Sequence, residues 1–365
     1  MNDIKVGVIG LHRGRSFIRI CSVLGGMKVT AVHDIDAAAL NRFAGGLDAF
    51  ITSNLEDFLN QDFEVAVVAS PLPFHAQHVI AALRAGKHVL SEVTACSSLE
   101  EAKGLVEAVR SSDRVYMMAE NYRYFDEVEL VRRLHQEGAF GDVYYGEGEY
   151  VHDCQELWRG PDGGLTWRGR GGLGVYCTHS LGPLLYILGD SVASVSSMDV
   201  AGGKFDPEVK IPTMHVLHLQ TRGGALLRVR VDHVSPRPHG MAYYSLQGTQ
   251  GAYEGARGFG DRPKLWLSSV HEPSRFAVPA EWHSLMDEAP RLIPERLAAP
   301  EEARSGGHGT SEYWLIPEFL AAVRGERAAP IDVFRALDYT LPGIAALESA
   351  KLGGTPVSVP DPRDW

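Results

Sequence analysis

The alternation of short apolar runs with helical patterns between Lys5 and Tyr116 constrains the fold more than any other feature. The apolar runs are rich in valine and read KVGVIG, MKVTAVHD, FEVAVVAS, KHVLSEV and RVYMMAEN. Helical patterns separate them, and Ser97 or Ser98 is expected to cap the last of these helices with Glu101 behind it. Strands that alternate with helices in this way are typical of βαβ units around a parallel sheet. The sequence therefore predicts a doubly wound α/β domain over residues 1–121.

The pattern changes after Asn121. A helical segment, ELVRRLHQEGAFG, is followed by stretches in which apolar and polar residues alternate, among them DVYYGEGEYVHD, TMHVLHLQTRG and ALLRVRVDHVS. Alternation with Gly-rich turns indicates an antiparallel sheet with one face in water. Residues 122–365 are therefore expected to form an α+β domain with a large, mainly antiparallel open sheet. Two late helices are expected after a loop at residues 287–309. They belong to this second domain or, alternatively, pack back on the first domain.

Composition excludes several classes of function. The chain has 365 residues, a length that favours two domains, and its net charge of −11 comes with scattered arginines. This argues against a nucleic-acid or anionic-membrane surface. The four cysteines have no CxxC spacing, so neither a metal site nor a disulfide framework is indicated. We find no signal peptide or membrane span and expect a cytoplasmic protein.

The turn after the first predicted strand carries a cofactor signal, VGVIGLHRGRSF. A complete dinucleotide motif is G-x-G-x-x-G, but here Gly10 begins it, His12 stands at the second glycine and Gly14 comes one residue early. The turn still lies between a strand and a helix, where a phosphate meets the helix N-terminus. We therefore expect Gly10, Gly14 and Arg13 to contact a dinucleotide. His12 is either a pyrophosphate contact or an exposed loop residue.

The nucleotide is predicted to be NAD. Asp34 ends the next predicted strand, about 20 residues after the glycines, where an acidic side chain accepts hydrogen bonds from the ribose hydroxyls. A carboxylate at this place repels a 2′-phosphate, so NADP is less favoured.

With these motifs in place, the sequence resembles the Gfo/Idh/MocA family of oxidoreductases over nearly its whole length. The blocks that carry the resemblance are VGVIGL, then VAVVASPLPFHAQHVIAALRAGKHVLSEVTACSSLEEA. The family's catalytic Lys of Glu-Lys-Pro falls on Val93, and its usual substrate-domain Asp falls on Val175, while its His matches His179. The resemblance implies cofactor contacts from Ser70, His75, Glu92 and Glu120.

A narrower resemblance is to the NAD-dependent α-N-acetylgalactosaminidases, which also lack the Lys. The shared blocks here are EVTA, MMAEN, GEYVHD, YCTHSLGP, SPRP and LQGTQG, in the same order. In those enzymes tightly held NAD oxidises a sugar hydroxyl, the aglycone is eliminated, water adds and the hydride returns. By position the resemblance implies an active-site group of Glu120, Tyr150, His152, Tyr176 and His179.

These residue types suit hydride removal from an alcohol. The hydroxyl needs a base, and the unperturbed pKa of histidine, ~6.5, is close to neutral pH. Alternation along a strand puts Tyr150 and His152 on one face, and Tyr176 and His179 are one helical turn apart if a helix begins near Gly174. The alternative for any one of these histidines is that its ring forms structural hydrogen bonds at an interface and takes no part in catalysis.

Three further side chains are candidates for substrate binding: Arg237, Trp167 and Asn121. Arg237 is expected to contact a sugar hydroxyl and Trp167 to stack on a sugar ring, with ordinary packing as the alternative for the tryptophan. For Glu120, the alternative to a ligand contact is an ion pair with Arg123.

The leading hypothesis is an NAD-dependent oxidoreductase that acts on a ring secondary hydroxyl of a sugar, glycoside or cyclitol. A redox-assisted glycosidase and a non-catalytic nucleotide- or sugar-binding protein are the alternatives. The expected partner is a small carbohydrate, with no nucleic acid and no membrane. By resemblance we expect a homodimer or homotetramer.

Overall fold

The computed structural model describes residues 3–171, 176–237, 241–269, 282–306 and 308–365. The chain divides into two compact units, and each is discontinuous in sequence. The first comprises Met1–Tyr124, Pro300–Thr340 and Asp361–Trp365, and the second Phe125–Ala299 and Leu341–Pro360. These units are not identical to the domains expected at 1–121 and 122–365, and that domain division stays a prediction.

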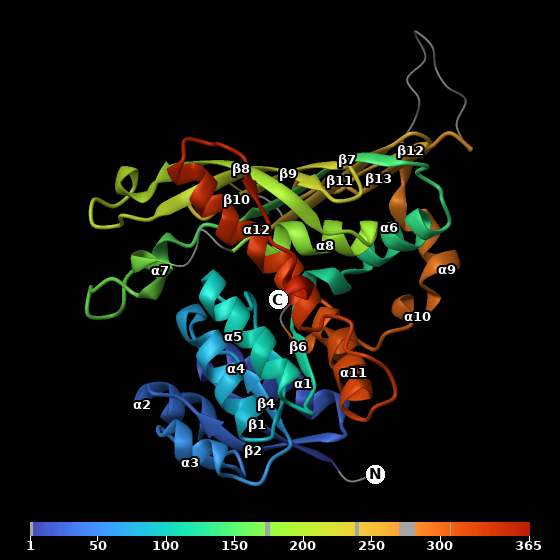
Figure 1. Cartoon of the computed structure of the whole chain (residues 1–365). Coiled ribbons are helices and arrows are strands. Elements are labelled where there is room, and N and C mark those ends of the chain that lie inside the picture. The colour runs from blue at the N-terminus through green and yellow to red at the C-terminus, as the bar shows by residue number, and fades with distance from the viewer. Residues whose placement is uncertain (1–2, 172–175, 238–240, 270–281, 307) are drawn as a thin grey trace. The chain divides into compact units, whose positions relative to one another are not determined.

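The first unit is built on a parallel sheet (Figure 1). Within the described residues this sheet has six strands in the order β3-β2-β1-β4-β5-β6. The strands are β1 (Ile4–Ile9), β2 (Met27–His33), β3 (Phe50–Thr52), β4 (Val65–Val68), β5 (His88–Ser91) and β6 (Tyr116–Met118). This is the strand order of dinucleotide-binding folds, in which the direction of winding reverses between β1 and β4. The predicted doubly wound α/β architecture is confirmed.

Helices connect these strands: α1 (Leu11–Leu24), α2 (Ala37–Ala39), α3 (Leu55–Leu59), α4 (His75–Arg84) and α5 (Leu99–Arg110). The first unit also includes α11 (Ser311–Val323) and the start of α12 (Val333–Lys351). The Oγ of Ser98 accepts from the backbone N–H of Glu101, whose carboxylate in turn accepts from the N–H of Ser97. This reciprocal cap fixes the start of α5 where the sequence predicted it.

The second unit contains a larger sheet. Within the described residues it has nine strands in the order β14-β13-β12-β11-β7-β10-β9-β8-β15. The strands are β7 (Val143–Val151), β8 (Val192–Ala201), β9 (Pro212–Thr221), β10 (Leu226–Asp232), β11 (Ala242–Gly248), β12 (Gly251–Glu254), β13 (Lys264–Leu267), β14 (His283–Ser284) and β15 (Val357–Ser358). All these neighbours are antiparallel except β7 and β10. The predicted mainly antiparallel sheet is confirmed.

One face of the larger sheet is covered by α6 (Asp126–Gln136) and α8 (Thr178–Leu188), as Figure 1 shows. Along β10 the side chains of Leu227, Val229 and Val231 are buried, whereas Arg228 and Arg230 are partly exposed. Alternation of this kind is what the period of two in the sequence predicted.

The predicted loop at residues 287–309 is wrong in part, because it holds short helices. They are α9 (Ala289–Leu292), α10 (Pro294–Leu297) and the 3₁₀ segment η8 (Glu301–Gly306). The sequence did not reveal them, because α9 and α10 have only four residues each and η8 only six, too few to show an apolar period.

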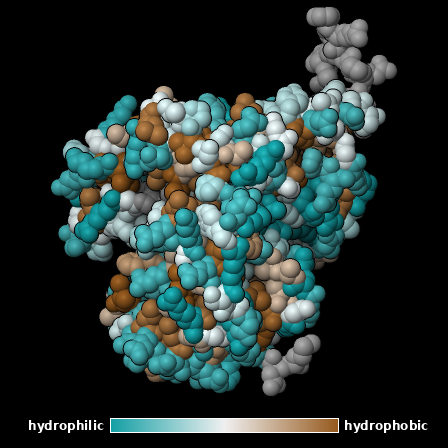
Figure 2. Space-filling model, viewed as in Figure 1, coloured by the Kyte–Doolittle hydropathy of each residue, from teal (hydrophilic) through white to brown (hydrophobic). Residues whose placement is uncertain are grey.

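On the face seen in Figure 2, hydrophilic residues are interspersed with hydrophobic ones over both units. Within the described part of the chain, no helix combines the length and apolar character that a bilayer crossing needs.

Candidate active site

The first turn of the parallel sheet forms a cradle at the N-terminus of α1. Gly10 has a φ of 85°, and a Cβ there would lie 2.5 Å from the carbonyl oxygen of Ala69. Gly14 is buried, and a Cβ there would lie 2.6 Å from a methyl group of Val8. Gly14 therefore lets α1 pack closely on β1, the task of the third glycine in a complete motif. The backbone N–H groups at the start of α1 are suited to a phosphate.

Asp34 lies beside this cradle. Its Oδ2 accepts from the N–H of Leu11 at 2.7 Å and its Oδ1 from the N–H of Asp36 at 2.9 Å. A hollow next to it is flanked by Ile35, whose side chain is 80% exposed, and by Phe74. The residues that line the hollow are Ile9, Gly10, His33, Asp34, Ile35, Ser70, Pro71, Phe74 and His78. A carboxylate beside exposed apolar side chains fits the ribose and base of an adenosine group.

His12 and Arg13, the two other residues of α1 that were predicted to contact the dinucleotide, differ in exposure and in partners. The His12 side chain is 72% exposed, and its Nε2 lies 3.2 Å from Asp36. His12 is thus exposed, but it lies within α1 rather than in a loop, and a pyrophosphate contact stays a prediction. Arg13 is held by two carboxylates: its Nε donates to Glu92 at 2.5 Å and its Nη2 to Glu312 at 3.2 Å. A phosphate contact by Arg13 stays a prediction.

His75 joins two turns at the carboxyl edge of the sheet. Its Nδ1 lies 2.8 Å from the carbonyl oxygen of Thr94 and its Nε2 lies 2.7 Å from that of Ser70. The ring is buried, and burial lowers the pKa of His75, so the neutral ring donates to one of the two oxygens. The Oγ of Ser70 lies 2.9 Å from Nδ1 of His78. His75 thus positions the turns after β4 and β5, and a direct cofactor contact stays a prediction.

Glu120 and Asn121 follow β6 at the same edge. Both are buried, and Oε1 of Glu120 accepts from the N–H of Tyr122 at 3.1 Å. The amide nitrogen of Asn121 lies 3.4 Å from Oε1 of Glu312, and Arg123 donates to the carbonyl oxygen of Pro330. Glu312 was not among the predicted site residues, because nothing in its local sequence points to partners so far away along the chain.

The second unit brings the two predicted tyrosine–histidine pairs into one cluster. The hydroxyl of Tyr150 lies 3.0 Å from Nδ1 of His152, and the hydroxyl of Tyr176 lies 3.3 Å from Nε2 of His179. The rings of Tyr150 and His179 are 5.1 Å apart between centroids, and those of Tyr150 and Tyr176 are 5.7 Å apart. The cluster therefore combines two hydroxyls with two imidazoles.

Packing of α8 on β7 creates this cluster. A Cβ at Gly148 would lie 1.9 Å from the carbonyl oxygen of Ser180, so only glycine allows the helix to approach the strand this closely. The hydroxyl of Tyr244 donates to the carbonyl oxygen of His179 and fixes the first turn of α8 from β11. The predicted helix start near Gly174 lies outside the described residues; among those described, α8 begins at Thr178 and Tyr176 precedes it. Val175 lies outside the described residues.

His233, which follows β10, belongs to the same cluster but was not among the predicted site residues. Its ring lies 5.8 Å from that of Tyr150 and 6.1 Å from that of Tyr176. The side chain is 1% exposed, and among the described residues neither ring nitrogen has a hydrogen-bond partner. Burial, together with the nearby His152 and His215, lowers the pKa of His233 to about 3, so the ring is neutral.

The two predicted sugar contacts from the second unit, Arg237 and Trp167, each have a neighbouring side chain in the structure. The guanidinium of Arg237 lies 3.7 Å from Glu149, which projects from the face of β7 opposite to Tyr150. Trp167 begins α7 (Trp167–Arg170), and the guanidinium of Arg168 lies 4.1 Å from its ring. The substrate contacts of Arg237 and Trp167 stay predictions. Among the described residues, no group of three or more His, Cys, Asp or Glu is arranged to hold a metal.

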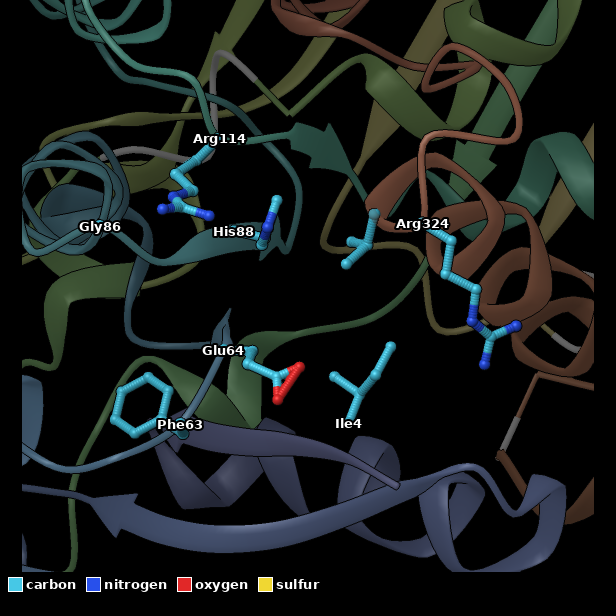
Figure 3. Close-up of a pocket in the computed structure, with 8 residues that line it drawn as sticks. Ile4, Phe63, Glu64, Gly86, His88, Arg114 and Arg324 are labelled. Carbon is cyan, nitrogen blue, oxygen red and sulfur yellow. The ribbon is translucent and has the colours of Figure 1, made fainter. Parts of the chain in front are cut away.

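A second hollow, of about 600 Å³, lies at the amino edge of the parallel sheet (Figure 3). Its walls include Ile4 at the start of β1, His88 at the start of β5, and the guanidinium-bearing residues Arg114 and Arg324. Dinucleotides bind at the carboxyl ends of parallel strands, where Gly10 and Asp34 lie. This hollow is therefore separate from the cofactor cradle.

Models of known protein families match both the first and the later part of the chain. Residues 4–120 match the family described as the oxidoreductase family with an NAD-binding Rossmann fold, and residues 128–254 match the Gfo/Idh/MocA C-terminal domain. The chain belongs to the Gfo/Idh/MocA family. Residues 209–363 also match the C-terminal domain of glycosyl hydrolase family 109.

Curated relatives of this Gfo/Idh/MocA chain are named as glycosyl hydrolase family 109 proteins. A glycosyl hydrolase family 109 protein of Saccharopolyspora erythraea is 28% identical over 98% of this chain and 83% of its own length. Another, of Streptomyces filamentosus, is 29% identical over 99% of this chain and 77% of its own length.

Solved structures agree in fold. Levoglucosan dehydrogenase in complex with NADH and levoglucosan has a TM-score of 0.81 and 22% identity, over 98% of this chain and 100% of the other. The WlbA dehydrogenase from Bordetella pertussis, in complex with NADH and UDP-GlcNAcA, has a TM-score of 0.80 and 20% identity, over 98% of each chain. The resemblance seen in the sequence is thus confirmed, and the chain is an oxidoreductase-family protein with a dinucleotide-binding unit.

Proposed function

We propose that the chain oxidises a ring secondary hydroxyl of a sugar, glycoside or cyclitol. The observation that carries the proposal is the contact of 3.3 Å between the Tyr176 hydroxyl and Nε2 of His179, beside the Tyr150–His152 pair, in a chain with an NAD-binding unit. When bound, NAD accepts the hydride from the carbon of the alcohol.

The cluster can take up the proton that the alcohol loses. Where Tyr176 donates to Nε2 of His179, the lone pairs of its hydroxyl oxygen are free to accept the substrate hydroxyl. As the carbonyl forms, the proton moves from the substrate to Tyr176 while Tyr176 passes its own proton to His179. Tyr150 and His152 supply a second pair of polar groups that orients the ring hydroxyls. Buried rings around the cluster exclude water and strengthen these hydrogen bonds.

The cofactor of this reaction is NAD rather than NADP. The support for this choice is Asp34, whose carboxylate lies beside the hollow at the start of α1. A ribose hydroxyl donates to a carboxylate, whereas a 2′-phosphate brings a second negative charge to the same place.

The proposal is tested by His179→Ala. Loss of a general base lowers turnover by a factor of about 100 or more. Binding of NADH, followed by its fluorescence, stays unchanged because the dinucleotide cradle is built by other residues. His218→Ala is the matched control, since His218 is exposed on β9. If the His179 variant keeps its turnover, His179 is not the base.

The second candidate function is a redox-assisted glycosidase. It is favoured by the match of residues 209–363 to the glycosyl hydrolase 109 C-terminal domain. In that reaction the first step is the same, but the aglycone leaves, water adds and the hydride returns to the sugar. Aryl glycosides separate the two candidates: a dehydrogenase accumulates NADH, and a glycosidase releases the phenol without net NADH.

A non-catalytic nucleotide- or sugar-binding protein is the remaining alternative, and any turnover removes it. The homodimer or homotetramer implied by the resemblance and the cytoplasmic location expected from the sequence also stay proposals.

A further inference from the structure

A single guanidinium links three distant segments at the carboxyl edge of the parallel sheet. Arg13 is the third residue of α1, Glu92 follows β5, and Glu312 is the second residue of α11. Nε of Arg13 donates to Glu92 at 2.5 Å, and its Nη2 donates to Glu312 at 3.2 Å. We call these three residues the Arg13 clasp.

The carboxylate of Glu312 is held from several sides. Its side chain is 1% exposed, and it lies 2.8 Å from Nδ1 of His308 and accepts from Oγ of Ser311 at 2.9 Å. The amide of Asn121 lies 3.4 Å away. Burial by itself raises the pKa of Glu312, but His308, Arg13 and Ser311 lower it to about 2, so the group is charged. A buried charge of this kind is stable only while its partners remain in place.

The clasp lies along the edge where a dinucleotide binds. One end is the first turn of α1, next to Gly10, and the other end is at the turns after β5 and β6, which hold Glu92 and Asn121. In this strand order the adenosine half lies on the β2 side, where Asp34 is, and the nicotinamide half on the β4 and β5 side. The 3₁₀ segment Glu301–Gly306, just before α11, packs against α1.

We propose that Arg13 and Glu312 are positioning residues that retain the bound dinucleotide, so that opening of the Arg13 clasp precedes its release. The inference rests on NAD binding as proposed above. Opening is infrequent because it leaves Glu312 buried without its cation. A retained dinucleotide serves a reaction in which the same cofactor molecule first takes and then returns a hydride.

The test is the dissociation rate of NADH from the purified full chain, followed by fluorescence after dilution into excess NAD. Glu312→Gln removes the charge that holds Arg13 and keeps the shape. We expect it to raise the dissociation rate by about tenfold or more, because changes in such contacts appear mainly in dissociation. Faster cleavage by a protease within residues 301–306 or 308–312 should accompany the faster release.

Glu318→Gln is the matched control. Glu318 also lies on α11 and accepts from the hydroxyl of Tyr124 at 2.7 Å and from Arg327 at 3.1 Å, away from α1. We expect the wild-type dissociation rate in this variant. If Glu312→Gln does not fold, Arg13→Lys gives the same test, because lysine lacks the planar fork that spans two carboxylates.

Equal dissociation rates in the wild type and the Glu312 variant would overturn the clasp while leaving NAD binding intact. Equal acceleration in both glutamate variants would also overturn it, since α11 as a whole would then be responsible. A wild-type chain that binds no NADH would overturn the proposed function and with it this inference.

Discussion

Tyr150 is the side chain that joins the two predicted pairs. It contacts His152 through its hydroxyl, and its ring lies near those of His179, Tyr176 and His233. Alternation along β7 was enough to predict the Tyr150–His152 pair. The Tyr176–His179 pair was predicted from one turn of helix, but Tyr176 precedes α8, which begins at Thr178. The approach of one pair to the other depends on how α8 packs on β7, which no local pattern encodes.

Asp34 makes a prediction about the choice of cofactor. Asp34→Asn removes the negative charge that opposes a 2′-phosphate, so the ratio of the dissociation constants of NADP and NAD should fall by about tenfold. Fluorescence titration with NADPH and NADH measures this ratio. Asp36→Asn is the control, because Asp36 is more exposed and caps α2. An unchanged ratio in the Asp34 variant would remove Asp34 from cofactor selection.

His233 makes a prediction about stability and pH. Its folded pKa is about 3, below the usual 6.5, with burial as the main cause and His152 and His215 adding to it. Between these values the unfolded chain binds a proton that the folded chain does not, so stability falls as the pH falls from 6.5 towards 3. The contribution is about 1.4 kcal/mol per pH unit.

His233→Phe should flatten this dependence, and urea unfolding at a series of pH values measures it. His218→Phe serves as the control on an exposed position of β9. A variant with the same pH slope as the wild type would show that His233 is not the group responsible.

At the scale of elements, the sequence predicted strands and helices well where the apolar period was strong. The βαβ alternation and the helices α6, α11 and α12 follow from it, and Ser98 capped α5 as expected. The parallel pairing of β7 with β10 was not predicted, because the partners of a strand depend on tertiary packing rather than on its own residues. The short helices between residues 289 and 306 were missed, because none of them is long enough to show an apolar period.

Gly148 makes a prediction at this scale. Gly148→Ala puts a methyl group against the backbone oxygen of Ser180, so α8 must move away from β7. We expect a loss of about 1–3 kcal/mol in the free energy of unfolding, together with reduced turnover because His179 moves with α8. Denaturant unfolding and the steady-state rate measure the two effects.

Gly104→Ala is the matched control within α5, where the added methyl group meets only Ile80 at an ordinary 3.5 Å. This change should stabilise the chain by up to about 1 kcal/mol, as alanine favours helix. If Gly148→Ala is equally harmless, the close approach of α8 does not hold the cluster together.

For the whole molecule, the sequence left the placement of the late part of the chain open, with packing back on the first domain as an alternative. Residues 300–340 and 361–365 belong to the first unit, and they bring Glu312 to Arg13 across 299 positions of sequence. The pattern of α11 predicts a helix but not which surface it covers. Arg13 was accordingly predicted to meet a phosphate, while its carboxylate partners were not foreseen.

Identification of the nucleotide carried by the purified protein tests the central claim most directly. Mass spectrometry and absorbance of the denatured chain should show NAD or NADH in stoichiometric amount, or an empty protein that binds added NAD in preference to NADP. Tightly carried NAD would favour the redox-neutral glycosidase, and an empty protein that binds NAD would favour the dehydrogenase. A chain that neither carries nor binds NAD would contradict the account and leave the non-catalytic alternative.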